Sequence, residues 1–375
     1  MDKALHGNDY TAPPACKPPL PAGKRGGEAL MVGIQKNDAG NRRGVQDSGG
    51  NTASHWSEYR EESAGYGLLK LTLLMFRALP APILKLCAFP VSLCYYIFSK
   101  RARDESRRYL KKAAAKLRTE GRILAINPLA HILAFSLTVI EKMEAWGGKI
   151  ALKNICFQED DCGDLMERLE NGEGALLLCS HLGNAELLRA LAGFNRTGVS
   201  RNIPVTSIVD FSVTGSFNRM LRELNPESMV RLIGAGGIGP ETVIVLEERL
   251  EAGELVVIAG DRTSAHTRNK YLSIPFLDEN APFAYGPFLL AGLLGVPAYF
   301  VFALRRKDLS LSSLYDLHVH KSPVNFACGR KEREDRIVET ARLFVEKLEY
   351  YCKQHPLQWY NFYDFWAEPK LPKGK

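Results

Sequence analysis

The chain has 375 residues, of which 46 % are hydrophobic and 24 % are charged. This balance is ordinary for a globular protein, so it excludes a wholly disordered chain and a membrane protein with many spans. The formal net charge of +7 suits an anionic lipid surface, an acidic carrier protein or a nucleic acid equally well, so the charge alone selects no partner.

The first 54 residues are rich in Pro, Gly, Asn and charged side chains, as in TAPPACKPPLPAGKRGG. Such a segment buries too little apolar surface to offset the entropy lost on ordering, so we predict a disordered tail over 1–54. It has no apolar stretch of the signal-peptide kind, and export is not indicated.

Residues 55–125 predict a membrane-associating helical region. The stretch 68–98 is apolar, but Lys, Arg and Pro interrupt it, whereas a spanning helix needs about 20 apolar residues in a row. We therefore expect one or two interfacial helices.

The next stretch, 99–122, carries ten cations against three acids: Lys100, Arg101, Arg103, Arg107, Arg108, Lys111, Lys112, Lys116, Arg118 and Arg122. An apolar anchor beside a basic stripe is typical of docking on an anionic cytoplasmic leaflet, here the inner membrane of a bacterium. A core helix followed by a solvated helix is the alternative.

Residues 126–375 predict one catalytic domain in which strands alternate with helices. Buried strands are expected at 175–180, 204–209, 254–260 and 297–304, with helical stretches between them and a last helix at 331–353. This alternation predicts an α/β layered domain.

The eight cysteines form no CxxC pair: Cys16, Cys87, Cys94, Cys156, Cys162, Cys179, Cys328 and Cys352. They indicate reduced thiols in a cytoplasmic setting rather than a disulfide framework or a zinc site. Cys179 precedes Ser180 and His181, which leaves a Cys–His nucleophile open. Cys179 also continues the apolar run ALLLC, however, and this favours a place in the core.

The segment ALLLCSHLGNAELLRALA carries the chemistry. His181 emerges at the end of a predicted strand, Gly183 and Asn184 supply a turn, and a helix follows for which Asn184 is a plausible N-cap. The turn lets Glu186 reach back to one imidazole nitrogen while the other nitrogen faces a cleft. We therefore predict His181 as a general base oriented by Glu186. The alternative is a core histidine beside a solvated glutamate.

HLGNAE (181–186) resembles the HX4(D/E) motif of the glycerolipid acyltransferase superfamily, and HLGN resembles the HFGN of the late acyltransferases of lipid A biosynthesis. Further resemblance lies in SFNRMLRELNP (216–226), GELVVIAGDRTS (253–264), residues 274–305 and HPLQWYNFYDFW (355–366), so that it spans about 53–369. The resemblance implies a glycerolipid-acyltransferase-like layered mixed sheet flanked by helices, with N-terminal amphipathic membrane-anchoring helices.

The resemblance also implies an activity. A fatty acyl group would pass from acyl carrier protein, or from coenzyme A, to a hydroxyl of a membrane lipid or lipid precursor, with no cofactor or metal. Expected substrate-binding residues are Gly183, Asn184, Arg219, Arg222, Asp261 and Arg262. AGDRT follows a predicted strand as HLGN does, so Asp261 and Arg262 are expected in the same cleft as His181, where the guanidinium could hold a phosphate or the developing oxyanion; a structural Asp261–Arg262 ion pair is the alternative. For Arg219 and Arg222 the alternative is a solvated surface. The stretch PFAYGPFLLAGLL (282–294) could line an acyl channel, and a merely buried helix fits as well. Ala185 stands where lipid A enzymes commonly carry Trp, which leaves the acceptor open between a lipid A precursor and other lipids, including acylated polyene pigments.

Other interpretations are weaker. A thioesterase or lipid hydrolase would use the same His181 to activate water, and a catalytically silent membrane-bound scaffold would keep only the fold. His318 and His320 alternate on a predicted strand, but no carboxylate or cysteine stands near them at ligand spacing, so a metal site is not favoured. No Gly-rich phosphate loop and no recognisable nucleic-acid fold is present in the sequence, so a nucleic-acid partner is not expected.

Overall fold

The computed structural model describes residues 73–76, 78–158, 160–193, 198–210, 230–263 and 270–368. The predicted tail over 1–54 lies outside these residues. So do Arg219 and Arg222, two of the expected substrate-binding residues.

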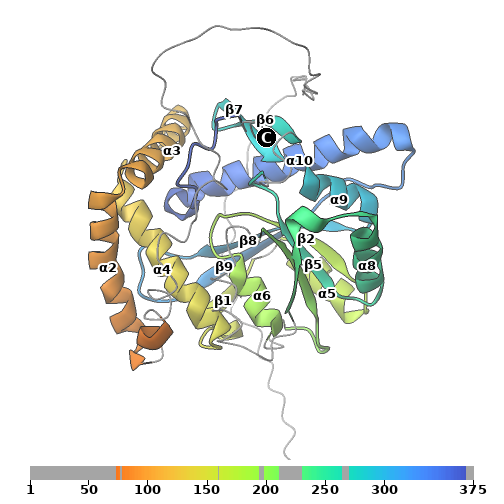
Figure 1. Ribbon diagram of the computed structural model, residues 1–375, viewed down its shortest axis with the longest axis horizontal. Coiled ribbons are helices and arrows are strands. Elements are labelled where there is room, and N and C mark those ends of the chain that lie inside the picture. The colour runs from red at the N-terminus through yellow and green to blue at the C-terminus, as the bar shows by residue number, and fades with distance from the viewer. Residues whose placement is uncertain are drawn as a thin grey trace, which may run out of the picture.

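A seven-stranded sheet forms the centre of the molecule (Figure 1). In spatial order it contains β1 (Ile155–Phe157), β9 (Tyr315–Lys321), β8 (Ala298–Arg305), β2 (Ala175–Cys179), β5 (Leu255–Ala259), β3 (Val205–Val209) and β4 (Val230–Gly234). All neighbours run parallel except β8 and β9, which are antiparallel. The predicted α/β class and the strands expected near 175, 204, 254 and 297 are thereby confirmed.

Helices cover both faces of the sheet because its central strands are apolar on both sides. In β2, Leu176 and Leu178 face one core, whereas Leu177 and Cys179 face the other. The first core lies under α8 (Pro240–Glu251), α9 (Gly286–Leu294) and α10 (Arg330–Gln354). The second lies under α5 (Cys162–Glu170), α6 (Glu186–Gly193) and the end of α4 (Pro128–Trp146).

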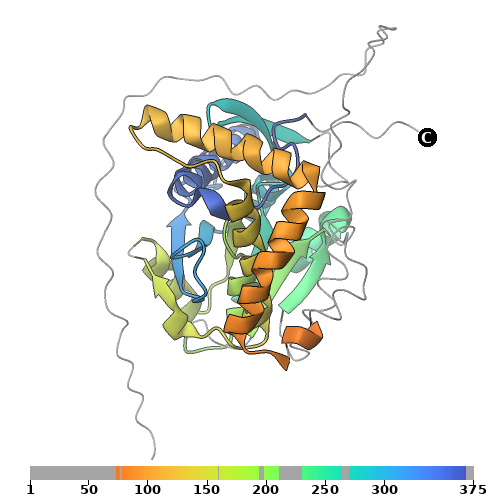
Figure 2. The same ribbon diagram turned by 90° about the vertical axis from the view of Figure 1, so that its left-hand side faces the viewer.

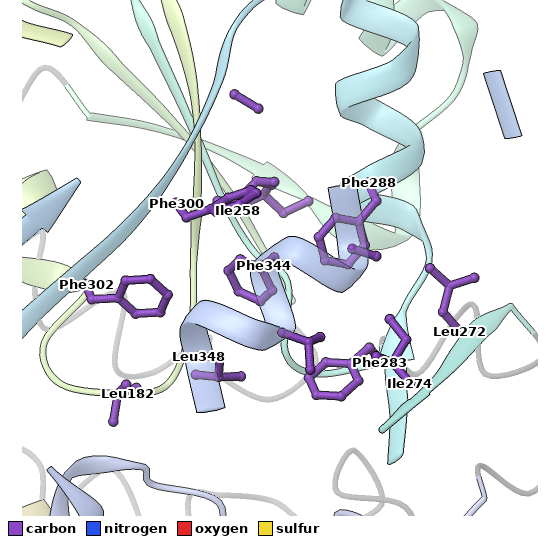
Figure 3. Close-up of a cluster of buried hydrophobic side chains, with 14 of the residues drawn as sticks. Leu182, Ile258, Leu272, Ile274, Phe283, Phe288, Phe300, Phe302, Phe344 and Leu348 are labelled. Carbon is purple, nitrogen blue, oxygen red and sulfur yellow. The ribbon is translucent and has the colours of Figure 1, made fainter. Parts of the chain in front are cut away.

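Phe344 of α10 is the centre of the first core (Figure 3). Its ring lies 5.5 Å from that of Phe288 and 5.6 Å from that of Phe300, centroid to centroid. A small antiparallel hairpin, β6 (Tyr271–Phe276) and β7 (Glu279–Ala284), closes one end of this core. The helical stretch once expected to line an acyl channel, α9, is buried here at Phe288, Leu290 and Ala291.

Two further helices precede the domain, α2 (Ala81–Phe98) and α3 (Lys100–Thr119). Helix α2 continues through Pro90 and lies along α4 at the edge of the molecule (Figure 2). Its inner face buries Leu84, Lys85, Ala88 and Ser92. Its other faces expose large apolar side chains: Ile83, Leu86, Phe89, Val91, Leu93, Tyr95, Ile97 and Phe98. Of the described helices, α2 alone is long and apolar enough to cross a membrane, judged by length and composition only.

Helix α3 presents less unpaired positive charge than its sequence suggests. Four of its cations form ion pairs with carboxylates, namely Arg107, Arg108, Lys112 and Lys116. Lys112 pairs with Glu279 and Lys116 with Asp278, both on the β6–β7 hairpin. The expected basic stripe is therefore partly an internal contact surface, because Arg108, Lys112 and Lys116 pair with carboxylates far away in the sequence.

Candidate functional site

The site forms where β2 and β5 end side by side. Their register places Cys179 opposite Ala259. His181 and Asp261 each follow the end of their strand by two residues, so parallel neighbours bring both side chains to the same edge of the sheet. The sequence had indicated that Asp261 and His181 would share this edge.

His181 and Asp261 form a close pair. His181 Nδ1 lies 2.8 Å from Asp261 Oδ1, and the backbone N–H of His181 donates to Asp261 Oδ2 at 2.9 Å. Asp261 is completely buried. Burial alone would raise the pKa of this carboxyl, but the facing His181 ring, its hydrogen bonds and Arg262 outweigh burial and lower the pKa to about 2.

This geometry selects one tautomer of His181. An ionised carboxylate accepts hydrogen bonds and donates none, so the proton of the neutral imidazole lies on Nδ1. The lone pair is then on Nε2, at the opposite edge of the ring. The His181 side chain is 34 % exposed. A partly exposed histidine oriented by a buried carboxylate is the arrangement of a general base.

Glu186 was expected to orient His181, and this expectation is corrected by the contacts. Asp261 occupies the position at Nδ1. Both Glu186 oxygens accept other hydrogen bonds: Oε2 from Trp146 Nε1 at 3.1 Å and Oε1 from Arg189 at 2.7 Å. Glu186 is the first residue of α6, and its carboxylate points toward Trp146 of α4. Arg189, one turn further along α6, neutralises the charge of this carboxylate.

Gly183 makes the sharp turn that lets the chain leave β2. Its φ is +72°, and a Cβ placed there would lie 2.1 Å from the carbonyl oxygen of Ala303. Its backbone N–H donates to Gln358 O at 2.9 Å. Gly183 therefore meets a structural requirement of the turn, because only glycine fits this conformation and this space. The substrate contact expected at Gly183 stays a prediction.

Asn184 is 0 % exposed, so a substrate does not reach it in this conformation. Its Nδ2 donates to Tyr315 OH at 3.2 Å, whereas its Oδ1 is buried without a hydrogen-bond partner among the described residues. The side chain thus points toward Tyr315 instead of capping α6, which corrects the expected N-cap as well as the expected substrate contact.

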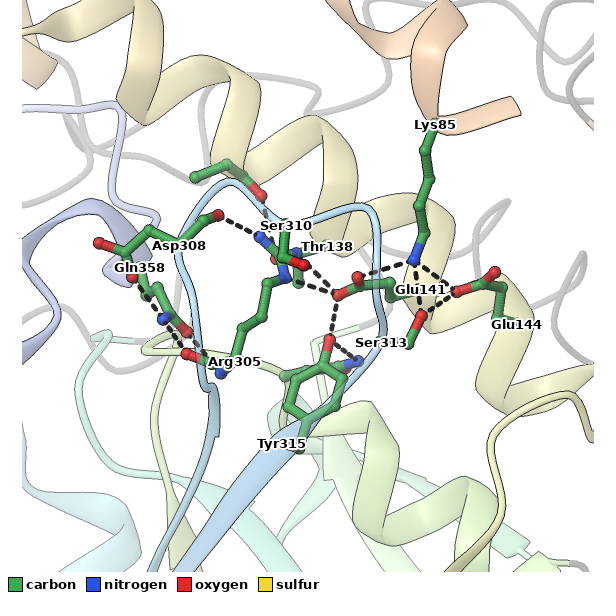
Figure 4. A network of polar contacts seen from close by, with 12 residues as sticks. Lys85, Thr138, Glu141, Glu144, Arg305, Asp308, Ser310, Ser313, Tyr315 and Gln358 are labelled. Carbon is green, nitrogen blue, oxygen red and sulfur yellow. Dashed lines mark hydrogen bonds and ion pairs between the residues drawn. The ribbon is translucent and has the colours of Figure 1, made fainter. Parts of the chain in front are cut away.

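Tyr315 joins this turn to a buried polar network (Figure 4). Tyr315 OH donates to Glu141 Oε2, which also accepts from Arg305 Nη2 at 2.7 Å. Glu141 Oε1 accepts from Lys85 Nζ of α2 at 3.0 Å. Lys85 is 1 % exposed at its side chain and also contacts Glu144 and Ser313. The network therefore ties α2 to β8 and β9 and, through the Tyr315–Asn184 hydrogen bond, to the turn after β2.

The guanidinium of Arg262 contacts the C-terminal segment. Its Nε donates to Asn361 Oδ1 and its Nη2 donates to Tyr360 O, each at 2.7 Å. These contacts bind the loop after β5 to the C-terminal segment. Among the described ion pairs, Asp261 has His181 as its partner, and the nearby charge of Arg262 also lowers the pKa of Asp261.

The neighbouring Cys179 is not a nucleophile in this structure. It is buried, and burial, together with the nearby Asp261 charge, raises the pKa of its thiol to about 12. Because the thiolate is the reactive form, the thiol is inert at neutral pH. Ser180 is also buried, and its Oγ accepts a hydrogen bond from Leu182 N.

His318 and His320 lie on β9, next to the edge strand β1, and both contact Tyr351 of α10. His318 Nδ1 lies 3.3 Å from Asp160, and His320 Nε2 lies 2.7 Å from Tyr351 OH. Within the described ranges, no three His, Cys, Asp or Glu side chains meet in a metal-binding arrangement.

A cavity of about 60 Å³ lies between the sheet and helices α5 and α6, lined by apolar side chains such as Leu177, Leu188 and Val257. Ligand pockets usually measure about 300–1,000 Å³, so this cavity is a packing void rather than an acyl-chain site.

No protein-family model and no curated protein sequence matches this chain.

The C-terminal QWYN segment contacts both members of the His181–Asp261 pair, which its sequence did not predict. Trp359 Nε1 donates to Asp261 Oδ2 at 3.2 Å, and Tyr360 N donates to His181 O at 3.1 Å. The signal available in the sequence was an aromatic and amide-rich stretch directly after the last helix, which is unusual for a solvated chain end.

Proposed function

We propose that this chain is a membrane-associated O-acyltransferase that moves a fatty acyl group from a thioester to a lipid hydroxyl. The observation that carries the proposal is the His181–Asp261 pair at the strand-end edge of a mostly parallel sheet. His181 is the general base, and Asp261, rather than Glu186, holds it in the Nδ1–H tautomer.

The reaction needs only a base that later acts as an acid. Nε2 of His181 takes the proton of the acceptor hydroxyl as its oxygen attacks the thioester carbonyl carbon. The tetrahedral intermediate then collapses, the C–S bond breaks, and the departing thiolate recovers the proton from Nε2. Asp261 stabilises the imidazolium between these two steps.

The finer fold and the family are part of the same proposal. HLGNAE and the GDRT segment resemble the corresponding segments of lipid A acyltransferases, and the two loops that carry them lie on neighbouring parallel strands. This arrangement supports a glycerolipid-acyltransferase-like fold. The donor is acyl carrier protein or coenzyme A, and the acceptor is a lipid hydroxyl.

The apolar outer face of α2 supports a place at the cytoplasmic face of the inner membrane. Leu86, Phe89 and Phe98 are each more than half exposed, whereas soluble proteins rarely leave such contiguous apolar surface uncovered. Because the opposite face of α2 packs on α4 through Leu84 and Ala88, the helix would lie in the interface and not cross the bilayer.

The membrane assignment is tested by flotation of the full chain with liposomes that contain anionic lipid. The double variant Leu86→Asp/Phe89→Asp should lose flotation. The control, Ile244→Asp, introduces the same charge at an exposed apolar residue of α8 and should float as the wild type does. Equal flotation of all three proteins would contradict docking through α2.

The activity is tested by mass spectrometry of membrane lipids from cells with and without the protein. The acyl species lost in its absence identifies the donor chain and the acceptor together. Free fatty acid released by purified protein in the absence of an acceptor would instead favour hydrolysis. An unchanged lipid profile together with an unchanged phenotype of His181→Ala would favour a scaffold.

A further inference from the structure

The segment Gln358–Asn361 pairs with the turn that carries His181. Leu182 and Trp359 form an antiparallel bridge. Gly183 N donates to Gln358 O at 2.9 Å, and Tyr360 N donates to His181 O at 3.1 Å. The backbone of the base is therefore held by a segment that lies about 180 residues further along the chain.

The Trp359 side chain contacts the other member of the pair. Its Nε1–H donates to Asp261 Oδ2 at 3.2 Å, and the residue is 0 % exposed. Aromatic neighbours fix the indole: its ring lies 4.7 Å from Phe365, 4.9 Å from Tyr109 and 5.1 Å from Phe276, centroid to centroid. In addition, His131 Nε2 lies 2.9 Å from the Trp359 carbonyl oxygen.

These contacts determine the orientation of the Asp261 carboxylate about its Cβ–Cγ bond. Asp261 Oδ2 accepts from two donors, the backbone N–H of His181 and the indole N–H of Trp359. Oδ1 is thereby left to face His181 Nδ1. A carboxylate held at one oxygen by one donor could turn about its Cβ–Cγ bond, whereas two donors from different segments oppose that rotation.

We propose that Trp359 is a positioning residue for the base: its indole N–H fixes the Asp261 carboxylate, and the carboxylate fixes the Nδ1–H tautomer of His181. The effect on turnover rests on the proposed acyl transfer, whereas the effect on the tautomer does not. Trp359 does not contact substrate in this account.

Trp366 provides a matched control. It belongs to the same aromatic cluster, and its indole N–H also donates, but to the backbone carbonyl of Phe276 at 3.3 Å. Trp359→Phe and Trp366→Phe thus remove the same donor and a similar amount of ring from one cluster. Only the first removes a hydrogen bond from Asp261.

The test records ¹⁵N spectra of histidine-labelled full-length wild type and of both variants at neutral pH. We expect His181 to show the Nδ1–H tautomer in the wild type and in Trp366→Phe. In Trp359→Phe, the two ring-nitrogen shifts should move toward each other as the second tautomer becomes populated. An unchanged His181 spectrum in folded Trp359→Phe would overturn the proposal.

A second measurement decides the case if Trp359→Phe does not fold. In tryptophan-labelled protein, Asp261→Asn should shift the indole resonance of Trp359 and leave that of Trp366 in place. If neither resonance moves, or both move equally, the hydrogen bond to Asp261 has no positioning role.

Kinetics then separate this proposal from the proposed function. With an acyl thioester and acceptor, Trp359→Phe should lower kcat about 10- to 100-fold with little change in KM, and Trp366→Phe should leave both nearly unchanged. Equal kcat losses in both variants would mean that Trp359 is only structural. A wild type that transfers no acyl group would overturn the proposed function, and the tautomer spectra would still decide the role of Trp359.

Discussion

His181 Nδ1 lies 2.8 Å from Asp261 Oδ1, while the backbone N–H of His181 donates to the other oxygen of the same carboxylate. One buried side chain thus fixes both the ring and the backbone of the histidine. The pairing follows from the register of β2 and β5, in which Cys179 and Ala259 stand opposite one another two residues before the pair.

Replacing Asp261 should damage turnover more than replacing Glu186. Asp261→Asn removes the charge that fixes the tautomer and stabilises the imidazolium, so kcat should fall by about 100- to 10,000-fold. Glu186→Gln changes a carboxylate that contacts Trp146 and Arg189, and kcat should fall less than about tenfold. The measurement is kcat/KM of both purified variants with one donor and one acceptor. A larger loss in Glu186→Gln would restore Glu186 as the orienting residue.

Gly183→Ala should disturb the turn beneath the base. The new Cβ would lie 2.1 Å from Ala303 O at a φ of +72°. The left-handed conformation costs a non-glycine residue about 1–2 kcal/mol, and the clash adds to this cost. Gly163→Ala is the control, because Gly163 lies in α5 with open space around it and alanine favours a helix. Urea unfolding should show lower stability in the first variant and unchanged or higher stability in the second.

Lys85→Met should lower the free energy of unfolding by more than is usual for a lysine on a helix that is largely exposed. Lys85 contacts Glu141 and Glu144 with 1 % of its side chain exposed. Removing one partner of a buried ion pair leaves uncompensated charge and costs about 3–5 kcal/mol. In the control, Arg107→Met, the pair with Asp104 is nearly half exposed, and such a pair contributes about 1 kcal/mol or less. If both substitutions lowered the free energy of unfolding by a similar small amount, the network in Figure 4 would contribute little to stability.

Stability should fall on mild acidification because of His131. This residue is fully buried between Ser106 and the Trp359 carbonyl. Burial lowers its pKa from 6.5 to about 4, although the hydrogen bond to Trp359 opposes the shift. Since the folded-state pKa is depressed, the stabilisation is complete above about pH 6.5, the ordinary value, and is lost progressively as the pH falls from there toward 4. The difference in unfolding free energy between pH 7.5 and pH 5 should shrink in His131→Gln. An equal difference in both proteins would contradict this assignment.

The sequence was sufficient for the α/β class, for the strands that carry the site and for the shared edge of His181 and Asp261. It was insufficient to identify which carboxylate contacts the ring. Glu186 is five residues from His181, but Trp146, forty residues upstream, and Arg189 take its oxygens. Only the packing of α4 against α6 brings Trp146 there.

Contacts between residues far apart in the sequence also explain why the ion pairs of the α3 cations were not predicted. Their partners Asp278, Glu279 and Asp364 are each more than 160 residues away in the sequence, so a local charge run was interpreted as a free surface. Pro90 likewise suggested a break in the apolar stretch, yet α2 continues through it because its packing against α4 holds the helix on both sides of the proline.

The most direct test of the account compares wild type with His181→Ala in the transfer of an acyl group from acyl carrier protein to a lipid hydroxyl, with the ester product quantified by mass spectrometry. Circular dichroism and the urea midpoint serve as the controls for folding. The account predicts an intact fold and a rate lower by about 100- to 10,000-fold, because the variant removes the base while the partly exposed imidazole contributes little to the core. Near-normal ester formation by folded His181→Ala would contradict it.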